Sequence, residues 1–138
     1  MAAKKEGVKA LTDMDIRTLV KWLKIPHFRG VYMRDELRGR RPRRNEYGII
    51  NLDGKQGPGT HWTAFFKRGK NKTYFDPIGD IKPPKELIAY LGPNIYYNTN
   101  RFQEPDDETP ICGHLSLIIL SDLSGGGDYQ EILNQYHG

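Results

Sequence analysis

Apolar residues with helical spacing open the ordered part of the sequence. Four of them recur at i, i+3, i+4 and i+7 and would share one helix face: Ile16, Leu19, Val20 and Leu23. Thr12, followed three positions later by Asp15, resembles a capping box in which Asp replaces the usual Glu. Pro26 would stop the helix. The pattern therefore predicts an amphipathic helix that begins near Thr12 and ends before Pro26.

Short β-favouring runs follow in the middle of the chain. Residues 61–66 and 73–75 carry large apolar side chains on either side of a polar turn that contains Gly69, which predicts a β-hairpin. Residues 28–58 mix short apolar groups with glycine, proline and charge, so we expect an irregular segment with one brief strand at 49–52. Pro83 and Pro84 precede a predicted short helix at 86–91, and a further strand is expected at 95–97.

The last third of the chain carries the predicted central helix. Its apolar residues keep helical spacing over 112–123 and form a wide stripe: Leu115, Leu117, Ile118, Ile119, Leu120 and Leu123. An acidic loop at 104–110 precedes this helix, and the glycines at 125–127 end it. Asp128 and Glu131 repeat the capping pattern before a last helix that ends near Tyr136.

Composition and length favour one globular domain. At 138 residues, 37% of them hydrophobic, the chain is long enough to bury a single core. Residues 1–10 are small, polar and basic, so we expect a flexible basic leader at 1–10 and one domain over 11–138. The sequence carries neither an apolar run of membrane-spanning length nor a recognisable secretory signal. These features predict a soluble, intracellular protein without membrane association.

Cys112 is the single cysteine and would begin the central helix. One cysteine forms neither an internal disulfide nor a cysteine-based metal site, and no metal is expected. Unpaired N–H groups at a helix start favour a thiolate, which would make Cys112 a nucleophile. Gly113 would let a substrate backbone approach and leave the Cys112 amide free to face an oxyanion. A buried, inert cysteine explains this position alone equally well.

A thiol nucleophile needs a base, and imidazole holds and returns a proton near neutral pH without unusual tuning. The chain has four histidines: His27, His61, His114 and His137. We expect His27 and His137 to be solvated. His114 lies two residues after Cys112, and on a helix its side chain would point away from the sulfur. The base is therefore expected to be His61, at the start of the hairpin.

Asp76 and Gln103 complete the candidate set. Asp76 ends the second strand of the hairpin, which would bring its carboxylate to the far nitrogen of His61, although an aspartate before proline is also a common turn residue. Gln103 precedes Cys112, and its amide would donate to a tetrahedral intermediate. Alone, Gln103 signals little. The ordered set of His, Asp, Gln and Cys at predicted element ends is what favours catalysis.

These residues lie in segments that resemble the adenovirus-type cysteine proteases of viruses and of Maverick/Polinton DNA transposons. The matching segments are 59–62, 74–79, Gln103 and 112–115, and 28–37 resembles the segment before the catalytic histidine of that family. The resemblance runs from about residue 11 to about residue 123. It implies an α+β fold of the adenain/Ulp1 type, in which a central helix carrying the nucleophile packs on a small mixed β-sheet with flanking helices.

The resemblance also implies a function. It describes a thiol endopeptidase that cleaves viral or transposon-encoded capsid precursors at small or glycine-containing sites, through an acyl-enzyme on Cys112 in a narrow groove formed by Trp62 and Gly113. It implies a protein substrate, no required cofactor, a monomer, and a location in the host nucleus or cytoplasm and in the virion. The alternative enzyme is a deconjugase that releases ubiquitin-like modifiers at a Gly-Gly end.

Three departures from the family bear on these expectations. Because the chain has no second cysteine, a disulfide-linked activating peptide is excluded, and activation by DNA or by a peptide bound without a disulfide stays open. Ser116 stands where relatives often carry a cysteine, and we interpret it as a packing residue on the helix interior. The loop between Gln103 and Cys112 is somewhat long for the family.

Basic residues gather between Arg34 and Arg44 in a chain of net charge +4. Five of them form the arginine loop: Arg38, Arg40, Arg41, Arg43 and Arg44. We take the loop as a candidate contact for nucleic acid phosphates, in line with the DNA stimulation that the resemblance implies. A merely solvated run of charge is the plainer interpretation. A catalytically silent nucleic-acid-binding module on the same fold is therefore a third interpretation of the chain.

Overall fold

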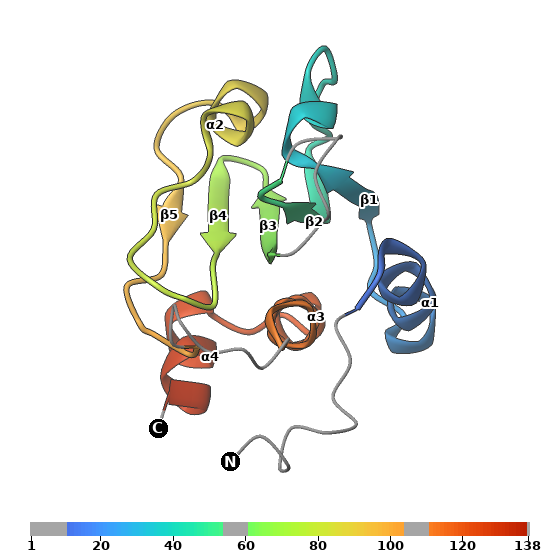
Figure 1. The fold of residues 1–138 in the computed structure, drawn as a ribbon. Helices are drawn as coiled ribbons and strands as arrows, with labels where there is room; N and C mark the ends of the chain where they lie inside the picture. The colour runs from blue at the N-terminus through green and yellow to red at the C-terminus, as the bar shows by residue number, and fades with distance from the viewer. Residues whose placement is uncertain (1–10, 54–60, 104–110, 138) are drawn as a thin grey trace.

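The computed structural model describes residues 11–53, 61–103 and 111–137. The elements follow in the order α1 (Asp13–Leu23), β1 (Phe28–Met33), the 3-10 helix η2 (Arg34–Leu37), β2 (Asn45–Asn51), β3 (Trp62–Arg68), β4 (Asn71–Phe75), α2 (Lys85–Leu91), β5 (Tyr96–Tyr97), α3 (Cys112–Ser124) and α4 (Tyr129–His137) (Figure 1). The predicted leader at 1–10 and the acidic loop at 104–110 lie outside the described residues.

A five-stranded mixed sheet of order β1-β2-β3-β4-β5 forms the centre of the molecule. β1 pairs with β2, and β4 with β5, in parallel, whereas β2, β3 and β4 are antiparallel neighbours. The predicted hairpin is β3–β4, and its turn is limited to Gly69 and Lys70. Gly69 has a φ of 57°, in the left-handed region that glycine enters at little cost.

Helices cover both faces of the sheet. The core on one face joins sheet residues such as Ile49 and Phe66 to α1, α3 and α4. The core on the other face joins residues such as Ile50 and Tyr74 to η2 and α2. Neighbouring residues belong to opposite cores because side chains alternate along a strand. The α+β class, with a central helix packed on a small mixed sheet and flanking helices, is confirmed.

Residues 28–58 are more regular than the pattern predicts. β1 and η2 lie where we expect an irregular segment, and β2 begins earlier than residue 49. β1 buries only Val31 and Tyr32, so its apolar pattern is too short to reveal a strand. At the start of β2, Glu46 is fully buried, and its carboxylate accepts hydrogen bonds from the Arg43 amide (2.6 Å) and the Tyr90 hydroxyl (2.5 Å). A charged residue is expected to be exposed, so the buried Glu46 interrupts the apolar pattern by which a strand is predicted.

The predicted helices form, with one correction on α3. In α1, the capping box is confirmed because Thr12 and Asp15 each accept a hydrogen bond from the other's backbone amide. α3 begins at Cys112, but its predicted stripe is wrong at Ile118, which is 41% exposed. Ser116 is fully buried instead, and its hydroxyl donates to the carbonyl of Trp62 at 3.3 Å. The interpretation of Ser116 as an interior packing residue is confirmed.

Candidate active site

Three element ends bring Cys112, His61 and Asp76 together. Cys112 is the first residue of α3, His61 immediately precedes β3, and Asp76 immediately follows β4. In the hairpin, Ala64 pairs with Phe75, so the residues before Ala64 lie beside those after Phe75. Backbone pairing also fixes His61 from the other side, because its carbonyl accepts a hydrogen bond from the Leu52 amide at 3.0 Å.

The imidazole of His61 is held by the carboxylate of Asp76. His61 Nε2 lies 2.8 Å from Asp76 Oδ1, and the same oxygen accepts a hydrogen bond from the Ile78 amide at 3.0 Å. Asp76 is completely buried, whereas the side chain of His61 keeps 20% of its exposure. This arrangement fixes the ring orientation and places a proton on Nε2. The other nitrogen, Nδ1, is left to face Cys112.

The thiol of Cys112 lies among hydrogen-bond donors. The Trp62 backbone amide donates to Cys112 Sγ at 3.4 Å. Burial raises the pKa of the thiol, but hydrogen bonds from His61 and from the amides of Trp62 and Gly113, together with the charge of His61, outweigh burial and hold the pKa below its usual range. The helix start adds amides without intrahelical acceptors. The site therefore favours a thiolate.

Burial and hydrogen bonding have opposite effects on the pKa of His61. Burial lowers its pKa, but the hydrogen bond to Asp76, the hydrogen bond with Cys112 and the charges of both groups outweigh burial and raise the pKa from 6.5 to about 9. Between the lowered pKa of Cys112 and about pH 9, the ground state is therefore a thiolate–imidazolium pair. Such a pair couples an activated nucleophile to an acid that can protonate a leaving group.

Trp62 and Gly113 lie beside this pair and pack against each other. Trp62 is only 4% exposed, and its Nε1 donates to the carbonyl of Leu11 at 2.8 Å. A Cβ added at Gly113 would lie 3.2 Å from atoms of both Trp62 and Leu11, so glycine permits this close packing. Trp62 and Leu11 thus pack against the start of α3 at Gly113. Substrate contact by either residue stays a prediction.

Gln103 is anchored next to Asp76 through its backbone. The amides of Phe102 and Gln103 both donate to the carbonyl of Pro77, at 2.8 and 3.0 Å. This carbonyl follows directly after Asp76, so the segment that carries Gln103 lies against the turn that carries the orienting carboxylate. Donation from the Gln103 side chain to an oxyanion stays a prediction.

Sequence reasoning missed Asn98, which follows β5 and is 2% exposed. Its Oδ1 accepts a hydrogen bond from the Asp76 amide at 2.9 Å, and its Nδ2 donates to the Asp76 carbonyl at 2.8 Å. In the sequence, Asn98 belongs to a polar stretch, 98–101, that is typical of a loop. That stretch carries no signal that distinguishes a buried asparagine.

The other three histidines are His27, His114 and His137. His27 is exposed, has a φ of 56°, and contributes its backbone carbonyl to the Tyr47 amide at 3.0 Å. His114 is partly buried on α3, and its Nδ1 has no hydrogen-bond partner among the described residues. The side chain of His137 lies outside the described residues. Among the described residues, the side chain of His61 hydrogen-bonds with Cys112.

The arginine loop lies far from this site. It connects η2 to the start of β2, whereas His61 pairs near the end of β2. All five arginines are exposed. The backbone is held in place, because Arg29 donates to the Arg41 carbonyl (3.2 Å) and Lys67 donates to the carbonyls of Arg43 (3.1 Å) and Arg44 (3.3 Å). Nucleic acid contact by the loop stays a prediction.

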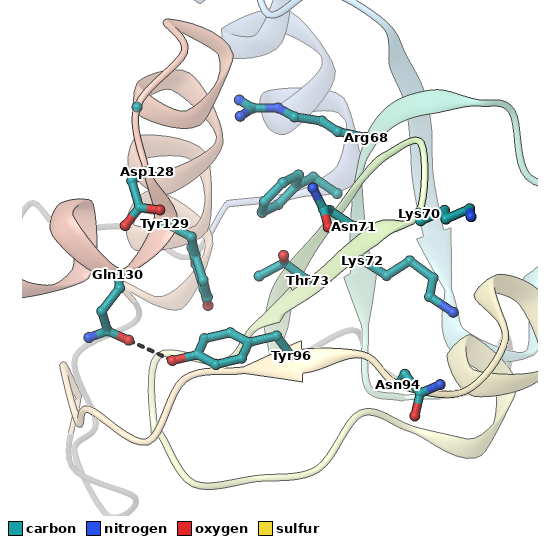
Figure 2. Close-up of a pocket in the computed structure, with 12 residues that line it drawn as sticks. Arg68, Lys70, Asn71, Lys72, Thr73, Asn94, Tyr96, Asp128, Tyr129 and Gln130 are labelled. Atoms are coloured by element: carbon teal, nitrogen blue, oxygen red, sulfur yellow. Dashed lines mark hydrogen bonds between the residues drawn. The ribbon is translucent and has the colours of Figure 1, made fainter.

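A hollow of about 560 Å³ also lies away from Cys112, at the turn end of the β3–β4 hairpin (Figure 2). Two of its cationic side chains have local structural contacts: Arg68 donates to the Tyr47 hydroxyl at 3.0 Å, and Lys72 to the carbonyl of Pro93. Tyr96 and Gln130 hydrogen-bond across it at 2.6 Å. We therefore assign it no role in the candidate chemistry.

The described residues contain no cluster of three or more His, Cys, Asp or Glu side chains that could hold a metal ion. None of the helices in these ranges is both long enough and apolar enough to span a membrane.

Comparison with solved structures identifies the fold. The "ASFV pS273R protease" matches with a TM-score of 0.58 at 20% sequence identity, over 94% of this chain and 62% of that chain. The "SUMO protease Ulp1 with the catalytic cysteine oxidized to a sulfenic acid" matches with a TM-score of 0.58 at 13% identity, over 97% of this chain and 77% of that one. The chain has the Ulp1-like cysteine protease fold. No protein-family model and no curated protein matches the sequence.

This chain spans about three fifths of the length of the ASFV protease chains that it matches, 62% and 63%. The elements that carry the candidate site in this chain are the β3–β4 hairpin and the start of α3. The sequence segments suggest membership of the adenovirus-type and Maverick/Polinton proteases. That assignment is finer than the shared fold shown by the structure comparison.

Proposed function

We propose that this protein is a cysteine endopeptidase in which Cys112, His61 and Asp76 act as nucleophile, base and orienter. The observation that carries the proposal is the contact of a thiol at a helix start with an imidazole whose Nε2 lies 2.8 Å from a buried carboxylate. Their mutual effect holds the pKa of the Cys112 thiol below its usual range and so favours the thiolate. Few structural arrangements need all three features together.

The proposed reaction follows from these groups. The Cys112 thiolate attacks the scissile carbonyl carbon, and the oxygen gains the negative charge, facing the Cys112 amide and the Gln103 side chain. The intermediate collapses, the C–N bond breaks, and the His61 imidazolium gives its proton to the departing amine. Neutral His61 then takes a proton from water, which attacks the thioester and releases the acid and the thiolate.

For the substrate, we propose viral or transposon-encoded structural precursors cleaved at small or glycine-containing sites. Support comes from the sequence segments described above. Deconjugation of a ubiquitin-like modifier is the second candidate, because one matching structure is named a SUMO protease.

The test compares the wild type with Cys112→Ala, His61→Ala and His114→Ala on glycine-containing precursor peptides and on a ubiquitin-like Gly-Gly fluorogenic conjugate. Cleavage should vanish with the first two variants and persist with the third. Cleavage of the conjugate alone would favour the deconjugase. Equal iodoacetamide reactivity of Cys112 before and after denaturation would contradict an activated thiol and the whole proposal.

We also propose that the arginine loop contacts nucleic acid phosphates. Support comes from five exposed cations on a backbone that Arg29 and Lys67 hold in one conformation. A loop whose backbone is already held loses less conformational entropy on binding than a flexible run would. Whether such binding changes the peptidase activity is a separate measurement.

A further inference from the structure

The side chain of Asn98 hydrogen-bonds to the backbone of the β4 side of the sheet just beyond the point where β4–β5 pairing stops. β4 and β5 pair at only two positions, Thr73 with Tyr96 and Tyr74 with Tyr97. Beyond them, the Asn98 side chain accepts from the amide and donates to the carbonyl of Asp76, at 2.9 and 2.8 Å. Both backbone groups of Asp76 are therefore held by one side-chain amide that is 2% exposed.

The same residue holds the segment that carries Gln103. Asn98 Nδ2 also donates to the Asn100 carbonyl at 3.0 Å, and the Asn98 carbonyl accepts from the Asp80 amide at 2.9 Å. Gln103 in turn donates its amide to the Pro77 carbonyl. The turn at 76–80 and the segment at 98–103 are thus tied together on both sides of Asn98.

Position matters for Asp76 because one oxygen does two tasks. Oδ1 accepts from His61 and from the Ile78 amide, so a small shift of the backbone changes both distances. A hydrogen bond between charged groups weakens steeply as its geometry is lost. Since Asp76 supplies the main interaction that raises the pKa of His61, its placement governs how much thiolate Cys112 carries.

We propose that Asn98 is a positioning residue of the active site, which aligns Asp76 on His61 and fixes the Gln103 segment to the same turn. The inference rests on the proposed function, since it concerns that thiolate–imidazolium pair. Asn98 touches neither the reacting sulfur nor the imidazole. It acts through the backbone of Asp76, and neither a matching sequence segment nor the hydrophobic pattern assigns it a role.

The test is the pH profile of Cys112 alkylation by iodoacetamide in Asn98→Ala, compared with the wild type. Tyr129→Phe is the matched control, because the Tyr129 hydroxyl also makes a buried hydrogen bond to the β4 backbone, at the Tyr74 carbonyl (2.9 Å). We expect Asn98→Ala to lower the rate at pH 6 about tenfold, as loss of an orienting partner typically does. Tyr129→Phe should keep the wild-type profile even if its melting temperature falls.

A second variant and a direct titration guard against a folding defect. Asn98→Thr keeps an acceptor for the Asp76 amide and should give an intermediate profile. The ring signals of His61 in the NMR spectrum of folded molecules should titrate at a lower pH in both Asn98 variants. A wild-type profile in Asn98→Ala, or an equal shift in Tyr129→Phe, would overturn the role of Asn98. An ordinary thiol profile in the wild type would instead refute the proposed function.

Discussion

Replacing Asp76 with asparagine tests the electrostatics of the site most directly. The pKa of His61 rises from 6.5 to about 9, a change of about 2.5 pH units, or about 3 kcal/mol in favour of the imidazolium. This is an upper bound, because the His61 side chain keeps 20% of its exposure and solvent screens part of the interaction. Burial lowers the same pKa, so the raising effect depends on Asp76 and Cys112.

Asp76→Asn removes the charge and keeps the shape. Burial then dominates, and the pKa of His61 should fall to 6.5 or below. The thiol loses the charge of the imidazolium, so the pKa of Cys112 should rise. The new amide can also donate to Nε2, which would force the proton onto Nδ1, the nitrogen that must act as base. We expect the alkylation rate at pH 6.5 and kcat/KM each to fall about 100-fold.

Two measurements check this expectation. NMR titration of the His61 ring gives its pKa in the folded protein, and iodoacetamide kinetics between pH 4 and 10 give the thiolate profile. Asp128→Asn is the control, since Asp128 caps α4 through the Glu131 amide and lies outside the site. If His61 still titrated near pH 9 in Asp76→Asn, Asp76 would not be the group that raises its pKa, and our account of the pair would be wrong.

Three further predictions concern the surroundings of the site. Gly79 (φ 84°) lies against the Asn100 backbone, whereas Gly39 (φ 77°) has open space around it. Gly79→Ala should therefore destabilise the protein by at least about 2 kcal/mol more than Gly39→Ala in chemical denaturation. Equal losses of stability would contradict the close approach of Gly79 to Asn100. Gly113→Ala should displace Trp62, and we therefore expect kcat/KM to fall about tenfold and stability to fall by about 1–3 kcal/mol; unchanged kinetics would refute this packing role. Replacing Arg41 and Arg44 by alanine should reduce the slope of log affinity for duplex DNA against log salt concentration by about 2, whereas Arg34→Ala should leave the slope unchanged. An unchanged slope in the Arg41 and Arg44 double variant would contradict phosphate contact by the loop.

The sequence could predict the parts of the fold that depend on local pattern. Thr12 with Asp15 caps α1, and Cys112 begins α3, because capping and helical spacing are short-range properties. The hairpin brings His61 to Asp76 because antiparallel strands fix which residues face each other. β1 could not be predicted in this way, since its hydrogen bonds depend on parallel pairing with β2 and its pattern of burial covers only two residues.

Asn98 shows why part of a candidate site stays hidden from sequence reasoning. The chemistry of a nucleophile, a base and an orienter restricts each of them to few residue types. A sequence search for those types therefore finds Cys112, His61 and Asp76 as candidates. Asn98 acts through hydrogen bonds to the backbone of Asp76, and backbone groups are the same at every position. The role that we propose for it depends on the place where β5 ends, which is a tertiary property. If Asn98 governs the pH profile, groups of this kind set how well a recognisable triad works.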